Sequence, residues 1–361
     1  MSNKVSRSAL RKRNTNAIEV KVTLLGLDRT SGSIGFGLRS YSERPDTRVV
    51  FKIIGRDLDN ETMKAAQKLG LIDNFHRNLE NALEDADIVF INEPLSELQE
   101  LFERSATLLK PGVVLIDLSR LKQPAIDYAN RYFPRDEKGK SPFYLVGATP
   151  LVGFENLYNT NFSIEASREF MFRGCDMLIV PNASVPPEAV KVVTDIAEFL
   201  SMKPRFMDPA EHDALASIVD GLPTMLAMAL FQTVHNSPGS TDIFRASNSE
   251  FAIAVQSLRH VSARDMVLLW QNNRDSLIHH IDAIMATLTN MRQLLEEEQD
   301  PEVLQGVLET FLKAFVAWEV RREQNRWDDP QDNAYDNIDI GISNLIPGFG
   351  GRLSKRRQED D

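Results

Sequence analysis

The sequence has a single cysteine, Cys175, among its 361 residues, which excludes an intramolecular disulfide and fits a reducing compartment. It also has fewer basic than acidic residues, 41 Lys and Arg against 52 Asp and Glu, and the net charge of −11 argues against a nucleic-acid-binding protein, which needs a basic face to displace counterions. No apolar run approaches membrane-spanning length, and no apolar segment follows the basic start as in a signal peptide. The adjacent His279 and His280 point to different helix faces, so we predict no metal site. We expect a cytoplasmic protein without a nucleic-acid or membrane partner.

Basic residues gather at both ends of the chain. They are Lys4, Arg7, Arg11, Lys12 and Arg13 near the start, and Arg352, Lys355, Arg356 and Arg357 near the end. From residue 327 on, Asp, Asn, Gly and Pro dominate. We predict a disordered basic tail over residues 1–17 and an extended tail over residues 327–361, both solvated rather than bound to a specific anionic partner.

Between residues 18 and 207, short apolar runs alternate with helical segments. The runs are rich in β-branched residues and are not polar at alternate positions, which is typical of buried parallel strands. They cover residues 20–25, 49–54, 88–91, 113–116, 143–146 and 177–180. Helical segments at 61–69 and 95–109 lie between them, and KPG after the second is a stop signal. The repeated β-α units predict a doubly wound parallel sheet, a Rossmann-type dinucleotide-binding domain over residues 18–207.

The pattern changes at Asp208, where an N-cap acid is followed by Pro209 and Glu211, a strong helix start. Beyond it no run resembles a strand. Helical apolar spacing marks residues 210–219, 223–235, 249–258, 263–295 and 301–326. Several of these segments carry more apolar surface than one layer of helices needs. We therefore predict an all-helical domain over residues 208–326 that packs against a second copy of the chain as a homodimer.

A dinucleotide-binding fold holds the diphosphate where its first strand turns into its first helix, and needs glycine there for close approach of the backbone. Here the turn reads GLDRTSGSIG. Of the G-x-G-x-x-G pattern only Gly26 is kept, and Asp28 and Ser31 stand at the other positions. Asp28 adds a negative charge, and like charges about 4 Å apart repel by roughly 1 kcal/mol in water. The turn therefore predicts weak dinucleotide binding.

Other residues near the turn leave room for a remodelled site. Glycine continues beyond it, with Gly32 and Ser33 as candidate phosphate contacts, and Arg29 is placed to neutralise a phosphate or Asp28 itself. Asp57, after the second strand, stands where an acid would hold a ribose hydroxyl, although acids at strand ends are also common solvated turn residues. Two readings of the turn therefore stay open.

The middle of the chain resembles the prephenate and arogenate dehydrogenase family in the order and spacing of several motifs. They are KLGLID (68–73), ADIVF (86–90), LKPG (109–112), IDLSRLK (116–122), VGATPLVGFE (146–155) and MDPAEHD (207–213). The resemblance covers about residues 18–290. It implies a homodimer that uses NAD or NADP to oxidise and decarboxylate prephenate or arogenate in tyrosine biosynthesis, with the helical domain contributing to the substrate site.

The resemblance also assigns roles. A histidine near the substrate hydroxyl takes its proton, a serine helps to hold it, and an arginine binds a carboxylate. The position of that histidine is Thr149 here. The serine position is Arg120, with Ser119 one place earlier and Lys122 retained, and Arg259 is the candidate carboxylate ligand.

Further positions follow from the same comparison. Glu93 and Pro94, after the third strand, fall on the expected nicotinamide side of the cleft. Where the family reads S-H-L-P-H, residues 220–224 read DGLPT, so both histidines are missing. His212 matches a family position at a helix start, and we expect it to cap or pack locally.

Three functions are consistent with these residues. The first is an oxidoreductase of the prephenate dehydrogenase type with a remodelled turn and a substitute base. The second is a degenerate relative that keeps fold and dimer and binds a small molecule or a protein. The third keeps nicotinamide chemistry on a different acid. The family motifs favour the first, and the losses at the phosphate turn and at the proton acceptor favour the second.

Overall fold

The computed structural model describes residues 17–296 and 300–327. The predicted tails lie outside these residues, apart from residues 17 and 327. The described chain forms two compact units, the first comprising residues up to Ala216 together with Ala263–Leu268, and the second the remainder. The sequence pattern placed the domain boundary at residue 208. In the structure, residues 208–216 belong to the first compact unit.

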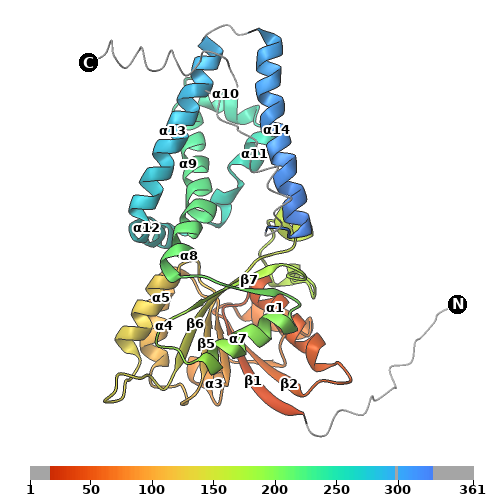
Figure 1. Ribbon diagram of the computed structural model, residues 1–361, viewed down its shortest axis with the longest axis vertical. Helices are drawn as coiled ribbons and strands as arrows, with labels where there is room; N and C mark the ends of the chain where they lie inside the picture. Colours follow the sequence, from red (N-terminus) through yellow and green to blue (C-terminus); the bar gives the residue numbers. More distant parts are fainter. Residues whose placement is uncertain (1–16, 297–299, 328–361) are drawn as a thin grey trace, which may run out of the picture. The chain divides into compact units, whose positions relative to one another are not determined.

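The first unit is built on an eight-stranded sheet of order β3-β2-β1-β4-β5-β6-β7-β8 (Figure 1). The strands are β1 (Ile18–Leu25), β2 (Val49–Arg56), β3 (Asn74–Phe75), β4 (Ile88–Ile91), β5 (Val114–Asp117), β6 (Tyr144–Pro150), β7 (Asp176–Pro181) and β8 (Lys203–Phe206). All neighbouring strands are parallel except β6 and β7. The predicted Rossmann-type fold is confirmed.

Three strands differ from the prediction. β7 was expected to be parallel but runs antiparallel to β6, which apolar patterning does not reveal because both kinds of strand are buried here. β3 and β8 were missed. β3 has only two residues, and β8 is largely exposed and contains Lys203 and Arg205, so neither carries an apolar run.

Helices cover both faces of the sheet. Those of the first unit are α1 (Arg29–Ser42), α2 (Asn60–Lys68), α3 (Leu79–Leu83), α4 (Leu95–Ser105), α5 (Lys122–Tyr132), α6 (Phe154–Leu157), η1 (Ile164–Ala166), α7 (Pro187–Phe199) and α8 (Pro209–Ala216). α1 and α7 pack together on one face, whereas α4 and α5 pack together on the other (Figure 1). α4 ends at Ser105, earlier than predicted.

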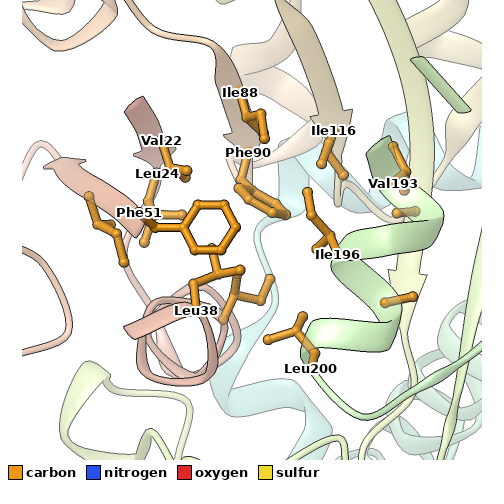
Figure 2. Packing of buried hydrophobic residues seen from close by; sticks show 14 of the residues in the cluster. Val22, Leu24, Leu38, Phe51, Ile88, Phe90, Ile116, Val193, Ile196 and Leu200 are labelled. Carbon is orange, nitrogen blue, oxygen red and sulfur yellow. The ribbon is translucent and has the colours of Figure 1, made fainter. Parts of the chain in front are cut away.

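The main core lies between the sheet and the helices α1, α2 and α7. Figure 2 shows Phe51 and Phe90 from neighbouring parts of the sheet meeting Leu38 of α1 and Ile196 of α7. These side chains are almost fully buried. Burial of this apolar surface, at about 25 cal/mol per Å², fixes α1 against the sheet and so positions the turn that precedes it.

The second unit is helical. Its elements are η2 (Ser217–Gly221), α9 (Leu222–His235), α10 (Ser240–Arg245), α11 (Ser249–Ala254), η3 (Gln256–His260), α13 (Arg274–Glu296) and α14 (Pro301–Gln324), and α12 (Ala263–Asn272) has residues in both units. The helix predicted over 263–295 is therefore two helices. Large apolar side chains stay exposed on α13 and α14, among them Met285, Leu308 and Leu312. Such surface is typical of a subunit interface.

One helical stretch, Pro209–His235, is long and apolar enough by composition to cross a membrane, with a mean hydropathy of 1.7 in its best window. The expectation that no run approaches this length is therefore wrong. The single stretch is weak evidence for a membrane span, because the interior and interface helices of a helical domain pass the same test.

Candidate functional site

The β1–α1 turn begins at Gly26, whose backbone has a positive φ of 81°. A Cβ atom here would lie 2.3 Å from the carbonyl oxygen of Asn92, at the end of β4. Only glycine fits both the conformation and the contact. The turn therefore rests directly on the neighbouring strand, as in a dinucleotide-binding fold.

Asp28 is the N-cap of α1. Its Oδ1 accepts hydrogen bonds from the amides of Thr30 at 2.7 Å and Ser31 at 3.0 Å. The Ser31 hydroxyl in turn accepts from the Asp28 amide at 2.9 Å, which completes a capping box. These amides at the helix start are the groups that a Rossmann fold directs at a phosphate. In this chain they are already bound by a carboxylate.

The charge at this turn is unfavourably placed for a second anion. Burial raises the pKa of the half-buried Asp28, while hydrogen bonds from Ser31, Asn92 and Thr30 act in the opposite direction. The Asp28 carboxylate lies at the N-terminus of α1, where the helix dipole favours one negative charge. A diphosphate in the family's position would meet both the side chain and its charge, so the residues present do not fit this group.

Arg29 turns away from the helix start. Its guanidinium donates to the carbonyl oxygen of Asn159 and lies 5.0 Å from the centre of the Phe162 ring. Burial lowers the pKa of Arg29, and the charge of Asp28 opposes this. The side chain thus secures the loop of residues 159–162 to the turn.

The other residues proposed for phosphate contact lie inside the first unit. A Cβ atom on Gly32 would lie 2.2 Å from the Ser167 hydroxyl oxygen. Ser33 is fully buried, donates to the Arg29 carbonyl at 2.6 Å and accepts from the Arg168 amide at 3.0 Å. Both positions therefore serve the packing of α1 against residues 164–168.

Polar residues at the carboxyl ends of β2 and β4 are engaged with one another. Asp57 accepts from the Leu27 amide at 2.8 Å, which ties the turn to β2. Glu93 forms an ion pair with Arg56 at 2.8 Å, and both side chains are nearly buried. Burial raises the pKa of Glu93, and the charge of Arg56 opposes this. The role of Glu93 was open from sequence, and the structure supplies its partner.

Pro94 stands beside this pair as the N-cap residue of α4. Its carbonyl oxygen accepts from the Glu97 amide at 3.0 Å, and its ring is exposed. The structure thus brings Gly26, Asp28, Asp57 and Glu93 to one edge of the sheet, where Rossmann folds bind their ligands.

Thr149 lies at the end of β6, next to the start of the helical region. Its hydroxyl oxygen is 2.8 Å from Nε2 of His212, and Nδ1 of His212 is 3.0 Å from Oδ1 of Asp213. His212 and Asp213 are buried, whereas Thr149 is half-buried. An ionised carboxylate only accepts, so Asp213 fixes the Nδ1–H tautomer and leaves Nε2 to accept from the Thr149 hydroxyl. The Thr149 hydroxyl is therefore hydrogen-bonded to a basic imidazole nitrogen of His212.

Asp213 is anchored by the start of α5. Its two carboxylate oxygens accept from the amides of Lys122 at 2.7 Å and Gln123 at 2.9 Å. It thereby caps a helix that has no cap of its own, since Leu121 at the N-cap position offers no side-chain bond. The expected local role of His212 is incomplete, because this residue also bonds to a strand 63 positions away.

Lys122 and Ser119 serve the interior of the first unit. The ammonium group of Lys122 is fully buried and donates to the carbonyl oxygens of Asp117 at 3.0 Å and Ala148 at 3.1 Å, and to that of Ser119. The Ser119 hydroxyl donates to the Leu121 carbonyl at 2.9 Å. Both side chains therefore hold the β5–α5 turn against β6.

Arg259 belongs to the second unit, where it lies exposed on η3. Gly221, at one of the two missing histidine positions, is also in this unit, and a Cβ atom there would lie 2.7 Å from Leu269. A histidine at 221 therefore requires repacking. Within residues 17–296 and 300–327, no group of His, Cys, Asp and Glu is arranged to hold a metal ion.

Two family models match the chain. Residues 46–204 match the nucleotide-binding domain of prephenate dehydrogenase, and residues 208–310 match its dimerization domain. The first match begins after the turn that contains Asp28. Together the two matches span most of the chain.

Similar proteins support the same assignment. Prephenate dehydrogenase of Bacillus subtilis is 24% identical over 287 residues, which is 78% of this chain and 72% of that protein. Cyclohexadienyl dehydrogenase of Zymomonas mobilis is 23% identical over 295 residues, 80% and 93% of the two chains.

Solved structures have the same fold. The prephenate dehydrogenase of A. aeolicus, in complex with hydroxyphenyl propionate and NAD+, has a TM-score of 0.66 at 21% identity and covers 82% of this chain and 97% of its own. Synechocystis arogenate dehydrogenase has a TM-score of 0.58 at 19% identity, with 81% and 98% covered. The chain therefore belongs to the prephenate and arogenate dehydrogenase family.

Proposed function

We propose that this protein is a degenerate member of its family that does not use a dinucleotide and acts as a homodimeric small-molecule-binding protein. One observation carries the proposal: the Asp28 carboxylate occupies the helix-start amides of Thr30 and Ser31, where the family fold would place a phosphate. Binding a diphosphate there requires two hydrogen bonds to be given up and two like charges to approach.

The positions around this turn support the proposal. Ser31 and Ser33 are fully buried, so their side chains offer nothing to an incoming ligand. Asp57 is bound to the turn itself through the Leu27 amide. The serine position of the family's D-x-x-S-x-K motif is Arg120, and the neighbouring Ser119 and the retained Lys122 both donate to backbone carbonyl oxygens of the first unit.

The match to a dimerization domain and the apolar surface of α13 and α14 support the homodimer. The small-molecule site is the carboxyl edge of the sheet near Thr149, a half-buried hydroxyl that is hydrogen-bonded to a buried imidazole. A ligand hydroxyl that reaches Thr149 can donate to its oxygen, because the hydrogen of Thr149 is already donated to His212.

The test is calorimetric titration of the full chain with NADH and with NADPH. We expect no saturable binding up to millimolar concentration for the wild type, and measurable binding for Asp28→Gly combined with Ser31→Gly. Asp59→Gly, which removes the N-cap carboxylate of α2 instead, is the matched control and should not gain binding. Low micromolar binding by the wild type would overturn the proposal.

One contact favours the family's dehydrogenase chemistry as a second function. His212 is positioned behind the residue that replaces the family's histidine and can take a proton from a ligand hydroxyl through Thr149. The assay is reduced-cofactor absorbance with prephenate and with arogenate. We expect background rates, and robust activity that is lost in His212→Asn would establish this second function instead.

A further inference from the structure

A pocket separate from the turn lies at the far end of α1. It has a volume of about 250 Å³ and is lined by residues from α1, from the segment 169–173 and from the end of α7. Ser40 in its wall lies ten residues beyond Thr30, so the pocket is about 15 Å along the helix axis from the capped turn, at about 1.5 Å per residue.

Two arginines line this pocket, and each is held by an aromatic ring. The guanidinium carbon of Arg173 lies 3.8 Å from the centre of the Phe170 ring. That of Arg44 lies 4.9 Å from the centre of the Tyr41 ring, which stacks on Phe199 at 4.0 Å. Stacking reduces the freedom of a guanidinium before a ligand arrives, which favours binding of a carboxylate.

The charges in the pocket are not cancelled. Among the described residues, neither Arg44 nor Arg173 has a carboxylate within ion-pair distance. Glu169 also lines the pocket, and its carboxylate accepts from the Ser40 hydroxyl at 2.6 Å. Two guanidinium groups and one carboxylate leave one positive charge, which matches a monoanion better than a dianion.

Ser201 provides an independent observation. It follows the C-terminus of α7 with a positive φ of 61°, at a position where helices normally place glycine. Serine is strained there, and the residue lines the pocket. The serine hydroxyl is therefore present at the pocket at a cost in backbone strain that glycine would avoid.

We propose that this pocket binds a small organic acid, with its carboxylate between Arg44 and Arg173 and its apolar body against Phe170 and Phe199. The Ser201 hydroxyl donates a further hydrogen bond to the carboxylate. The site does not depend on dinucleotide binding or on the residues around Thr149.

The test is calorimetric titration of the full chain with phenylacetate, inorganic phosphate and phenethylamine. We expect phenylacetate to bind, phosphate to bind at least tenfold more weakly because it gains nothing from the aromatic walls, and the amine not to bind. Arg44→Gln and Arg173→Gln should each weaken phenylacetate by roughly tenfold or more, the loss of one charged hydrogen bond. Arg48→Gln, an exposed residue outside the pocket with the same charge change, should leave binding unchanged.

Ser201→Gly separates binding from folding. It should weaken phenylacetate severalfold while the thermal unfolding midpoint rises or stays the same, because glycine relieves the positive φ. The proposal is overturned if phenylacetate does not bind, if the arginine variants bind it as the wild type does, or if phosphate binds equally well.

Discussion

Thr149 donates its hydroxyl to Nε2 of His212, a histidine held in place by the carboxylate of its own neighbour, Asp213. From the family resemblance, Thr149 appears only as the loss of the proton-accepting histidine, because the family has a histidine at this position. The structure places an imidazole directly behind it. An imidazole thus lies next to the end of β6, one side chain behind the position of the family's histidine.

This contact predicts a stability difference between two variants of Thr149. Thr149→Val removes the hydroxyl and leaves the buried Nε2 of His212 without its donor, so we expect a loss of about 1–3 kcal/mol in the free energy of unfolding. Thr149→Ser keeps the hydroxyl and should lose less. Urea unfolding measures both, and equal stability of the two variants would show that the hydrogen bond contributes nothing.

A second prediction concerns the pH dependence that Asp28 introduces. Its pKa is raised in the folded protein, so the folded state takes up this proton more readily than the unfolded state. Asparagine caps a helix as well as aspartate but carries no charge. Asp28→Asn should therefore be more stable than the wild type at pH 7, and the difference should shrink as the pH falls through the raised pKa toward 3.8.

Asp28→Ala controls for the cap itself. It should be about 1 kcal/mol less stable than Asp28→Asn at every pH, because the amides of Thr30 and Ser31 lose their acceptor. Urea unfolding from pH 4 to 7 compares the three proteins. A difference between wild type and Asp28→Asn that grows as the pH falls contradicts the raised pKa.

A third prediction uses the Arg56–Glu93 ion pair. Arg56→Met leaves a nearly buried carboxylate without its partner, and we expect a loss of about 3 kcal/mol in unfolding free energy. Glu93→Gln should restore most of this loss in the Arg56→Met background. A double-mutant cycle by urea unfolding measures the coupling, and strictly additive effects would mean that the pair does not interact.

The fourth prediction tests the homodimer. Leu308 and Leu312 lie one turn apart on α14, and their side chains are 61% and 63% exposed in the single chain. Leu312→Glu places a charge in the expected interface and should shift the protein from dimer to monomer in light scattering at micromolar concentration. Gln324→Glu adds the same charge at an exposed polar position of α14 and should remain dimeric. A monomeric wild type would refute the prediction.

The fold was largely predictable because its signals are local. Buried parallel strands are continuous apolar runs, and the helix start at Asp208 carries its own capping residues. The antiparallel β7 was not predictable, since direction depends on how residues 151–175 return to the sheet. β8 was not predictable because an exposed edge strand such as Lys203–Phe206 needs no apolar pattern.

Contacts at the candidate site could be predicted from the sequence only where the residues involved lie close together in the chain. The altered glycine pattern drew attention to Asp28 from sequence alone, and the capping box that Asp28 forms with Ser31 lies within the same four residues. The contact between Thr149 and His212 joins segments 63 positions apart. The pairing of Glu93 with Arg56 likewise requires the strand order, because it joins two strands that are not adjacent in the sheet.

Asp28 can be regarded as a ligand that is covalently tethered to its own receptor. A tethered group is present at an effective concentration that a dissolved competitor reaches only in the millimolar range or above. Added phosphate or salt should therefore do little to displace it from the amides of Thr30 and Ser31. An uncapped helix start gains stability when it binds an anion from solution. The start of α1 carries that anion in its own sequence, as the side chain of Asp28.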